Sequence, residues 1–289
     1  MSKPKILIQL DTDPHASVFD GVVAADAGID HLFQYGGVTL EQVRDLVHGA
    51  MFTRGPQDLH NTAIFVGGSD VRGGEKLMNA VTDCFFGPMR VSVLMDANGA
   101  NTTAAAAVLA AARHLDLANV TALVLAATGP VGARAVRLLA SQGAQVRVAS
   151  RSLDRAEAVC EDVKSRAPGA QLAAVKTSND DETAEALEGA ELLIAAGAAG
   201  IVLVSEETRQ KASRLQVAVD LNAVPPLGLE GVKVTDAGKE RGSQICYGAI
   251  GVGGTKMKIH KAAVRSLFET NDQILDAEQV FALGQQLGG

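Results

Sequence analysis

The residues best suited to chemistry lie where an apolar run gives way to a helical stretch. Residues 121–127 are mostly apolar, and the segment Ala127-Thr128-Gly129-Pro130-Val131-Gly132 leads from them into the helix. Gly129 permits close approach of the backbone to a diphosphate, and Gly132 permits tight packing of the helix on the strand. The first N–H groups of a helix attract an anion. We therefore expect Thr128 to Gly132 to bind a dinucleotide, although Ala127 replaces the first glycine of the usual triplet.

The end of the next strand indicates which dinucleotide binds. A strand expected at 145–149 runs into Ser150-Arg151-Ser152, and Arg155 follows one turn later. NAD sites usually place an acidic side chain there, whereas a guanidinium fork and serine hydroxyls suit a 2′-phosphate. NADP is therefore the predicted cofactor. The alternative is that Arg151 and Arg155 are solvated surface charges, with Asp154 near enough to pair with either.

Two later strand ends carry small or polar residues. The strand expected at 191–196 ends in Ala196 and Gly197, which leave room for a nicotinamide ring. The strand expected at 216–221 is followed by Asn222 and then by two prolines that stiffen the loop. We assign Ala196, Gly197 and Asn222 to the cofactor site. Asp220 and Asn222 have an alternative role as caps of that loop.

A third glycine-rich segment, 248–254, precedes Lys256 and a helix. Such a segment can bring backbone close to a flat ligand, and a lysine at its edge can polarise a carbonyl. The alternative is a plain helix entry with exposed lysines.

The elements that must position these residues alternate along the whole chain. Short apolar runs are separated by Ala-rich helical stretches, a pattern typical of parallel β-α-β units and of an α/β fold. Ser17 with Asp20, and Thr39 with Gln42, have the spacing of capping boxes and mark two helix starts. Strands are expected at 5–10, 63–67, 91–95, 121–127, 145–149, 191–196, 216–221 and 232–235, and a last helix at about 276–287.

Domain limits follow from this alternation. A fresh strand-turn-helix unit starts after the helical stretch that ends by Asn119. We expect an N-terminal α/β substrate domain over 1–112, a dinucleotide-binding domain over 113–268, and a C-terminal segment over 269–289 that can pack back on the first domain.

Composition narrows the class of protein. The 289 residues carry a net charge of -7, without Lys/Arg blocks, which argues against a nucleic-acid partner. The apolar run near the start is too short for a signal peptide or a membrane span, so a cytoplasmic protein without membrane contact is expected. The three cysteines are far apart and fit buried thiols, and the six histidines show no ligand spacing, so no metal is expected.

Several longer segments carry a resemblance over the whole chain. They are Asp11-Thr12-Asp13, Ser17-Val18-Phe19-Asp20, Asp96-Ala97-Asn98-Gly99-Ala100-Asn101-Thr102-Thr103, Asp220-Leu221-Asn222-Ala223-Val224-Pro225-Pro226-Leu227-Gly228 and Gly251-Val252-Gly253-Gly254-Thr255-Lys256. Together with the glycine turn, they resemble the bacterial NADP-dependent methylene-tetrahydromethanopterin dehydrogenases of methylotrophs. The resemblance implies a Rossmann-type NADP domain, an α/β pterin-binding domain, an active site in the cleft between them, and a homo-oligomer.

The resemblance also implies roles for individual residues. The substrate is a tetrahydromethanopterin-type pterin, whose one-carbon bridge loses a hydride and leaves positive charge shared between two nitrogens. Positioning and nearby carboxylates then matter more than a strong base. On this view Lys256 and Asp20 are catalytic, and the substrate-binding residues are Asp11, Ser17, Asp20, Asp96, Asn98, Thr102 and Lys256.

Three alternatives stay open on the sequence. Methylene-tetrahydrofolate shares the reactive ring system and is a second candidate substrate. A different NADP-dependent oxidoreductase, of the shikimate-dehydrogenase type, would share the β-α-β core. A redox sensor that binds NADP without turnover is the alternative outside enzymes.

Overall fold

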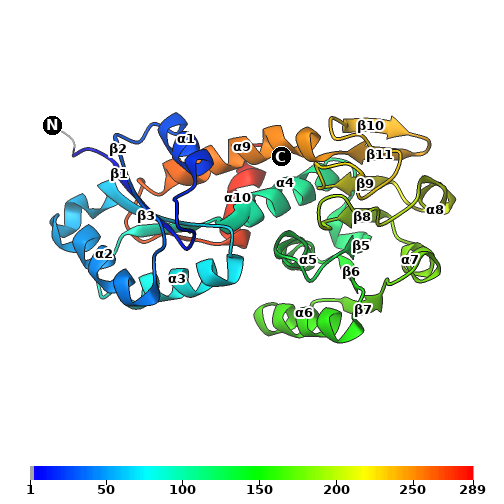
Figure 1. Cartoon of the computed structure of the whole chain (residues 1–289), viewed down its shortest axis with the longest axis horizontal. Helices are drawn as coiled ribbons and strands as arrows, with labels where there is room; N and C mark the ends of the chain where they lie inside the picture. The colour runs from blue at the N-terminus through cyan, green and yellow to red at the C-terminus, as the bar shows by residue number, and fades with distance from the viewer. Residues whose placement is uncertain (1–2, 289) are drawn as a thin grey trace. The chain divides into compact units, whose positions relative to one another are not determined.

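The computed structural model describes residues 3–288, which form two compact units (Figure 1). Unit 1 comprises the chain up to Thr102 and the segment Met257–Leu283, and unit 2 comprises Thr103–Lys256 and the residues from Gly284. Helices α4 (Ala100–Ala112), α9 (Ala249–Ser266) and α10 (Ala277–Gln286) contain the points at which the chain passes from one unit to the other. Each unit has its own sheet flanked by helices, so the predicted α/β class is confirmed.

Unit 1 is built on a five-stranded sheet in the order β12-β4-β3-β1-β2, with every neighbouring pair parallel. The register places Ile8 opposite Phe33 on one side and Ile64 on the other. Strands β1, β3 and β4 are buried almost throughout, as expected for a parallel sheet covered on both faces. The bounds are β1 Ile6–Asp11, β2 His31–Tyr35, β3 Thr62–Gly67, β4 Ser92–Met95 and β12 Ile274–Leu275.

The helices of unit 1 begin where the sequence signals them. Asp20 N donates to Ser17 Oγ (3.2 Å), and Thr39 N donates to Gln42 Oε1 (2.9 Å), so both expected helix starts are confirmed. In Figure 1, α2 and α3 lie on one face of the sheet and α1 lies on the other. The bounds are α1 Val18–Asp26, α2 Leu40–Phe52, α3 Val71–Asp83 and α10 Ala277–Gln286, with short 3-10 turns η1 Pro56–Asn61 and η2 Ala97–Gly99.

Unit 2 contains a seven-stranded sheet in the order β10-β11-β9-β8-β5-β6-β7. All neighbours are parallel except the hairpin β10–β11 at one edge. The chain order reverses between β5 and β8, and the carboxyl side of such a switch point is where open α/β sheets bind ligands. The bounds are β5 Thr121–Leu125, β6 Gln145–Ser150, β7 Leu172–Lys176, β8 Leu192–Ala195, β9 Val217–Asp220, β10 Ala237–Arg241 and β11 Gln244–Tyr247.

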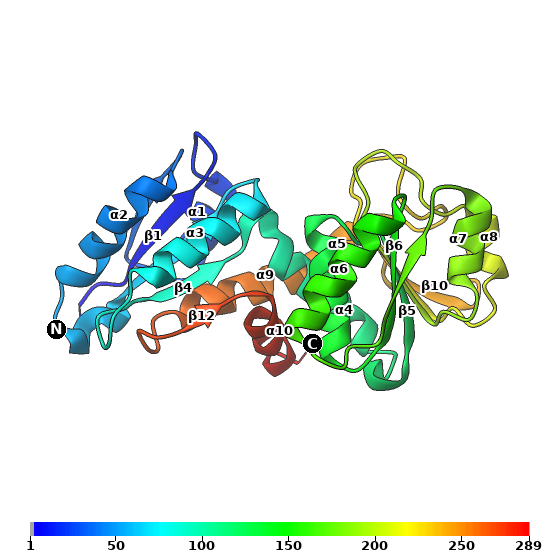
Figure 2. The same cartoon turned by 90° about the horizontal axis from the view of Figure 1, so that it is seen from below.

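Helices cover both faces of this second sheet. Figures 1 and 2 show α5 and α6 on one face and α7 and α8 on the other. Right-handed β-α-β crossovers that change direction at the switch point produce this arrangement. The bounds are α5 Pro130–Ser141, α6 Leu153–Arg166, α7 Asp180–Leu187 and α8 Glu206–Lys211, with a 3-10 turn η3 Leu117–Asn119 before β5.

Seven of the eight expected strands are present, and the strand expected at 232–235 is wrong. That segment forms no strand, because the backbone carbonyl group of Val234 accepts hydrogen bonds from the start of α9. Val234 O accepts from Ile250 N (2.8 Å) and Gly251 N (3.1 Å), and Lys233 N donates to Asp236 Oδ2 (2.8 Å). Five strands are not predicted from the sequence: β2, β7, β10, β11 and β12.

The contact limits of the units differ from the expected domain limits at 112/113 and 268/269. All three limits between the units fall inside continuous helices, α4, α9 and α10, where no break in the sequence pattern marks a change of neighbours. Strand β12 pairs with β4, so the start of the C-terminal segment 269–289 completes the sheet of unit 1. The domain division proposed from the sequence stays a prediction.

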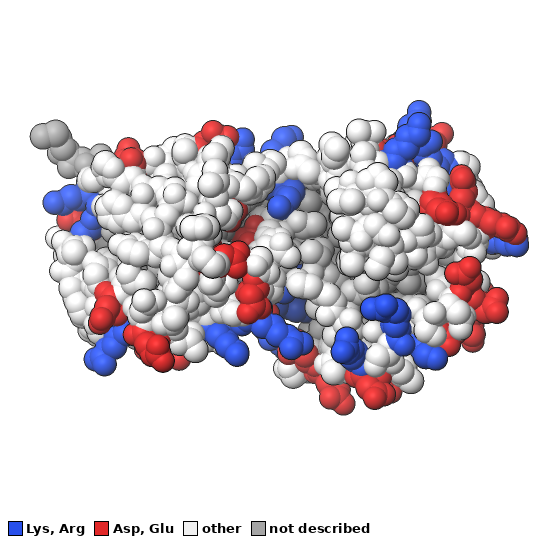
Figure 3. Space-filling view, viewed as in Figure 1, with Lys and Arg blue, Asp and Glu red and all other residues white. Residues whose placement is uncertain are grey.

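Charged side chains of the described residues are distributed in small groups of both signs. Figure 3 shows Lys and Arg interspersed with Asp and Glu over the viewed face, with uncharged surface between them. Within residues 3–288, no helix combines the length and the apolar character that a bilayer span requires.

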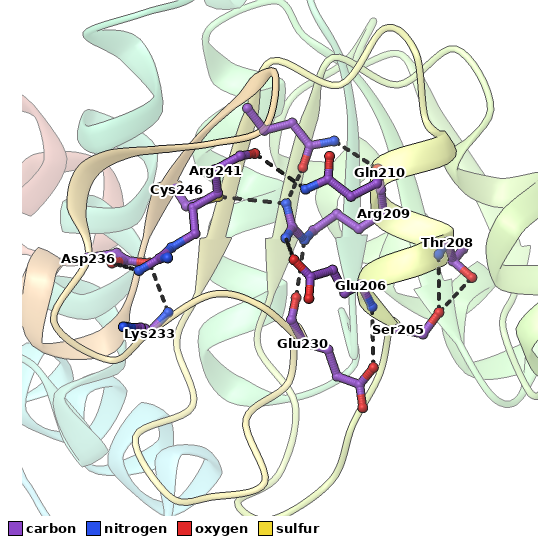
Figure 4. A network of polar contacts seen from close by, with 11 residues as sticks. Ser205, Glu206, Thr208, Arg209, Gln210, Glu230, Lys233, Asp236, Arg241 and Cys246 are labelled. Atoms are coloured by element: carbon purple, nitrogen blue, oxygen red, sulfur yellow. Dashed lines mark hydrogen bonds and ion pairs between the residues drawn. The ribbon is translucent and has the colours of Figure 1, made fainter.

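A buried polar network joins α8 to the edge of the second sheet (Figure 4). Arg209 has 0% of its surface exposed, and its guanidinium donates to Gln244 Oε1, to Glu230 O (3.3 Å) and toward Cys246 Sγ (3.8 Å). Gln244 returns a hydrogen bond to Arg209 O (2.7 Å). The network ties three segments that are distant in sequence to one buried charge.

Candidate functional site

The glycine turn of unit 2 lies at the carboxyl end of β5, beside the switch point. Gly129 is the N-cap of α5, and Pro130 is its first residue. A Cβ on Gly132 would lie 2.6 Å from Ala126 O, so the helix packs against the turn as predicted. Ala126 has φ 52, a left-handed conformation that costs a non-glycine residue roughly 1 kcal/mol. The turn thus keeps the first N–H groups of α5 at the edge of the sheet.

The serine and arginine residues of the second strand end lie next to this turn. Ala127 N donates to Ala149 O (2.9 Å), which joins the turn to the end of β6. Ser150 is the last residue of β6, and Arg151 is exposed. Ser152 is the N-cap residue of α6, and its N–H donates to Ser150 Oγ (3.2 Å). An exposed guanidinium here is suited to a phosphate at the same edge.

Arg155 is also exposed, on the first turn of α6. Within residues 3–288, neither Arg151 nor Arg155 forms an ion pair, so Asp154 does not neutralise them.

Ala196 and Gly197 follow β8 at the same edge. Ala196 N donates to Leu125 O (3.2 Å), and the Cβ position of Gly129 lies 3.9 Å from Ala196 O, so the two strand ends are adjacent. A Cβ on Gly197 would lie 2.7 Å from a methyl group of Leu203. The small residues predicted for a ring-binding position therefore lie beside the glycine turn.

Asn222 organises the loop after β9. Its side chain accepts from Val224 N (2.9 Å) and donates to Pro226 O (3.2 Å), and the Pro225–Pro226 peptide bond is cis. Asp220, itself buried, accepts from Asn222 N (3.0 Å) and Leu229 N (2.8 Å); burial raises its pKa above the ordinary value. The loop-capping alternative describes both side chains well, and cofactor contact by Asn222 stays a prediction.

The glycine-rich segment 248–254 belongs to α9 except for its first residue, so it is not a loop before the helix as expected. A Cβ on Gly248 or Gly251 would overlap backbone carbonyl groups of Lys233 or Asp236, whereas Gly253 and Gly254 have open space. Lys256 is partly buried on the same helix. The first two glycines therefore allow close packing of the helix on its own unit.

The first strand of unit 1 ends at a buried carboxylate. Asp11 has 0% exposure and accepts from Gln9 Nε2 (2.9 Å) and from Ser17 N at the start of α1. Burial raises the pKa of Asp11. Asp20 lies in the first turn of the same helix, and burial raises its pKa as well, while the charge of nearby His260 lowers it. The start of α1 thus holds two carboxylates at one edge of the sheet.

A third carboxylate follows β4. Asp96 is buried and accepts from Thr102 N (3.0 Å) and Thr102 Oγ1 (2.6 Å). Asn98 is exposed in the same loop, with φ 54, and its N–H donates to Gly68 O (2.6 Å) at the end of β3. These contacts gather the predicted substrate-binding residues of unit 1 at the carboxyl edge of its sheet.

His260, which is not among the site residues predicted from the sequence, lies between the carboxylates of α1 and the carboxylate after β4. Its Nε2 lies 4.0 Å from Asp20 Oδ1 and its Nδ1 lies 4.0 Å from Asp96 Oδ2. A signal was present in the spacing, because Lys256 and His260 are four residues apart on one helix and so share a face. Within residues 3–288, no group of three or more His, Cys, Asp or Glu is placed to hold a metal ion.

The two mainly parallel sheets, with a glycine turn at the switch point of one and clustered carboxylates at the edge of the other, define an α/β protein with a Rossmann-like sheet in unit 2. Solved structures share this fold. Shikimate 5-dehydrogenase from Listeria monocytogenes, in complex with shikimate and NAD, aligns with a TM-score of 0.53 at 12% identity, over 98% of this chain and 96% of that chain. Aspartate transcarbamoylase from Trypanosoma cruzi aligns with a TM-score of 0.55 at 13% identity, over 95% and 84%. At these identities the likeness concerns the fold alone.

Sequence relatives identify the family. Residues 18–98 match the family model described as methylene-tetrahydromethanopterin dehydrogenase, N-terminal. The chain is 44% identical to the bifunctional protein MdtA of Methylorubrum extorquens, over 99% of this chain and 100% of the relative. It is 31% identical to the NAD(P)-dependent methylenetetrahydromethanopterin dehydrogenase of the same organism, over 98% and 99%. The chain belongs to the methylene-tetrahydromethanopterin dehydrogenase family, and the resemblance found in the sequence is confirmed.

Proposed function

We propose that this protein catalyses the reversible NADP-dependent dehydrogenation of methylene-tetrahydromethanopterin to methenyl-tetrahydromethanopterin in the one-carbon metabolism of formaldehyde oxidation. The observation that carries the proposal is the whole-chain relationship to a dehydrogenase named for that substrate. The glycine turn of unit 2 and the carboxylates of unit 1 support it, because they suit an anionic dinucleotide and a substrate that becomes cationic.

The residues of unit 2 fit a dinucleotide. Gly132 lacks a side chain where one would displace the turn, and Arg151 presents a guanidinium without an ion-pair partner within residues 3–288. NADP supplies the hydride acceptor when it is bound. The residues that would hold it are Thr128, Gly129, Pro130, Val131, Gly132, Ser150, Arg151, Ser152, Arg155, Ala196, Gly197 and Asn222.

The residues of unit 1 act through charge and orientation. Loss of a hydride leaves positive charge shared across the N–C–N unit of the pterin, and an ionised Asp20 stabilises that charge more in the transition state than in the substrate. Thr102 fixes both oxygens of Asp96. In this proposal Lys256 donates a hydrogen bond to a pterin carbonyl. Asp11, Ser17 and Asn98 form other contacts with the substrate.

Initial rates with two carriers and two cofactors test this proposal. Of the four combinations of carrier and cofactor, we expect methylene-tetrahydromethanopterin with NADP to give the highest initial rate. A faster rate with methylene-tetrahydrofolate would show that this second candidate, and not methylene-tetrahydromethanopterin, is the main substrate. The absence of turnover with either carrier would contradict the proposed function.

Arg151→Ala tests the choice of cofactor. Loss of a charge-assisted hydrogen bond to the 2′-phosphate costs about 1.5–3 kcal/mol, so we expect the KM for NADP to rise roughly tenfold to a hundredfold. The KM for NAD, which lacks that phosphate, is expected to change less than about twofold. Arg166→Ala, at the other end of α6, is the matched control and should leave both constants unchanged. Equal increases for NADP and NAD would contradict the assignment of Arg151.

A homo-oligomer is part of the proposal. Strand β2 forms an edge of the unit 1 sheet and exposes Phe33 and Tyr35, and exposed apolar edges favour contact with another chain.

A further inference from the structure

His260 lies between two carboxylates that come from separate elements. The side chain is 1% exposed, and each ring nitrogen faces a different acid at 4.0 Å: Nε2 faces Asp20 of α1, and Nδ1 faces Asp96 after β4. The ring of Phe65 on β3 stacks on the imidazole, with centroids 5.7 Å apart and planes at 21°. Phe19 on α1 packs at 6.4 Å. These ring contacts hold the imidazole in an orientation in which one nitrogen faces Asp20 and the other faces Asp96.

The charges around this ring are mostly negative. Asp20 and Asp96 face it directly, Asp11 lies close enough to Asp20 to affect its ionisation, and Lys256 is one turn away on α9. Burial opposes ionisation of Asp20 most strongly, Asp96 and Asp11 add repulsion, and the charge of His260 acts in the opposite sense. A buried carboxylate without a cation close by takes up a proton and becomes neutral.

We propose that His260 is a positioning residue for the dehydrogenation. As an imidazolium between Asp20 and Asp96, it keeps the Asp20 carboxylate ionised and oriented, so that this carboxylate stabilises the cation that forms in the substrate. The inference rests on the proposed function. It adds to that function that the His260 imidazolium acts through Asp20 and has no contact with the reacting atoms.

The dependence of kcat on pH tests the role. Asp20 must be ionised for activity, so kcat falls as pH drops through the pKa of Asp20 in the enzyme–substrate complex. Without the imidazolium that pKa is higher. His260→Gln should therefore move the acid limb of the kcat profile upward by about one pH unit or more, with kcat about tenfold lower on the limb and recovery above it. The KM for the pterin should change less than about threefold.

His31→Gln is the matched control. It makes the same chemical change on exposed β2 of the same unit and should leave the profile unchanged. If kcat of His260→Gln fell by the same factor at every pH, His260 would have a purely structural role, and the inference would be overturned. An unchanged profile would overturn it as well.

A second readout does not require turnover. NMR of the six histidine rings, with the His260 signal assigned by its loss in His260→Gln or His260→Asn, reports its protonation directly in the wild-type protein. In the wild-type protein at pH 7 we expect the chemical shift of an imidazolium. In Asp20→Asn we expect His260 to lose its proton at a lower pH than in the wild-type protein. A neutral His260 at pH 7 in wild type would overturn the inference. If wild type has no turnover but His260 is charged, the proposed function fails and the ion pair stands.

Discussion

Arg209→Ala is expected to lower the free energy of unfolding by about 2–5 kcal/mol, the range for truncating a large buried side chain to alanine. The guanidinium is fully buried and its partners come from three segments: Gln244 on β11, the backbone of Glu230 and the side chain of Glu206 at 3.9 Å (Figure 4). Alanine would leave a cavity and a buried Gln244 side chain with one acceptor unsatisfied. The edge of the second sheet should open first.

Urea unfolding of three variants measures this effect. Arg214→Ala is the matched control, because Arg214 also forms an ion pair, with Glu191 at 2.6 Å, but is 64% exposed. An exposed pair contributes about 0–1 kcal/mol, so this variant should unfold close to wild type. Arg209→Met fills most of the volume without a charge and should lose less than Arg209→Ala. Equal midpoints for the two alanine variants would show that the buried network adds nothing to stability.

The parts of the fold that could be predicted are those in which local sequence and burial agree. Strands β1, β3, β4, β5, β8 and β9 are short, mainly apolar and buried, which is the composition that predicts a strand of a covered parallel sheet. Strand β2 was missed because it is an edge strand with mostly exposed side chains, and its sequence HLFQY shows no apolar alternation. The short strands β10 and β12 exist only because a neighbour supplies their hydrogen bonds.

The segment 232–235 shows the opposite error. Its alternating valines predict a strand. In the folded protein, however, the carbonyl group of Val234 accepts hydrogen bonds from N–H groups at the start of α9. Composition cannot reveal which backbone groups a distant helix will use.

The two halves of the candidate site differ in the same way. The dinucleotide turn is a local feature, since strand, glycines and helix are contiguous, and it could be predicted from spacing. The carboxylate cluster depends on contacts between α1 (Val18–Asp26), the end of β4 (Ser92–Met95) and α9 (Ala249–Ser266), which are far apart in the sequence. Family resemblance supplied Asp20 and Asp96, whereas His260 was set aside because it has no second histidine at a ligand spacing.

Gly251→Ala and Gly253→Ala should change stability in opposite directions, although both add one methyl group to the same helix. A Cβ on Gly251 would overlap the carbonyl oxygen of Asp236, and backbone cannot rotate away as a side chain can. We expect a loss of about 2–3 kcal/mol in the free energy of unfolding, as for overpacking elsewhere. Gly253 has nothing within 4 Å of its Cβ position, so alanine there should add about 0.5–1 kcal/mol through helix propensity.

The same pair of variants links the helix start to function. The turn at 233–236 accepts the first N–H groups of α9, so a methyl group on Gly251 must separate this turn from the helix that carries Lys256 and His260. Under conditions where both variants are folded, kcat should therefore fall in Gly251→Ala and stay at the wild-type value in Gly253→Ala. Thermal unfolding and initial rates on the two proteins check both statements. If Gly251→Ala were as stable and as active as wild type, close packing of α9 on its turn would have no part in holding Lys256 in place.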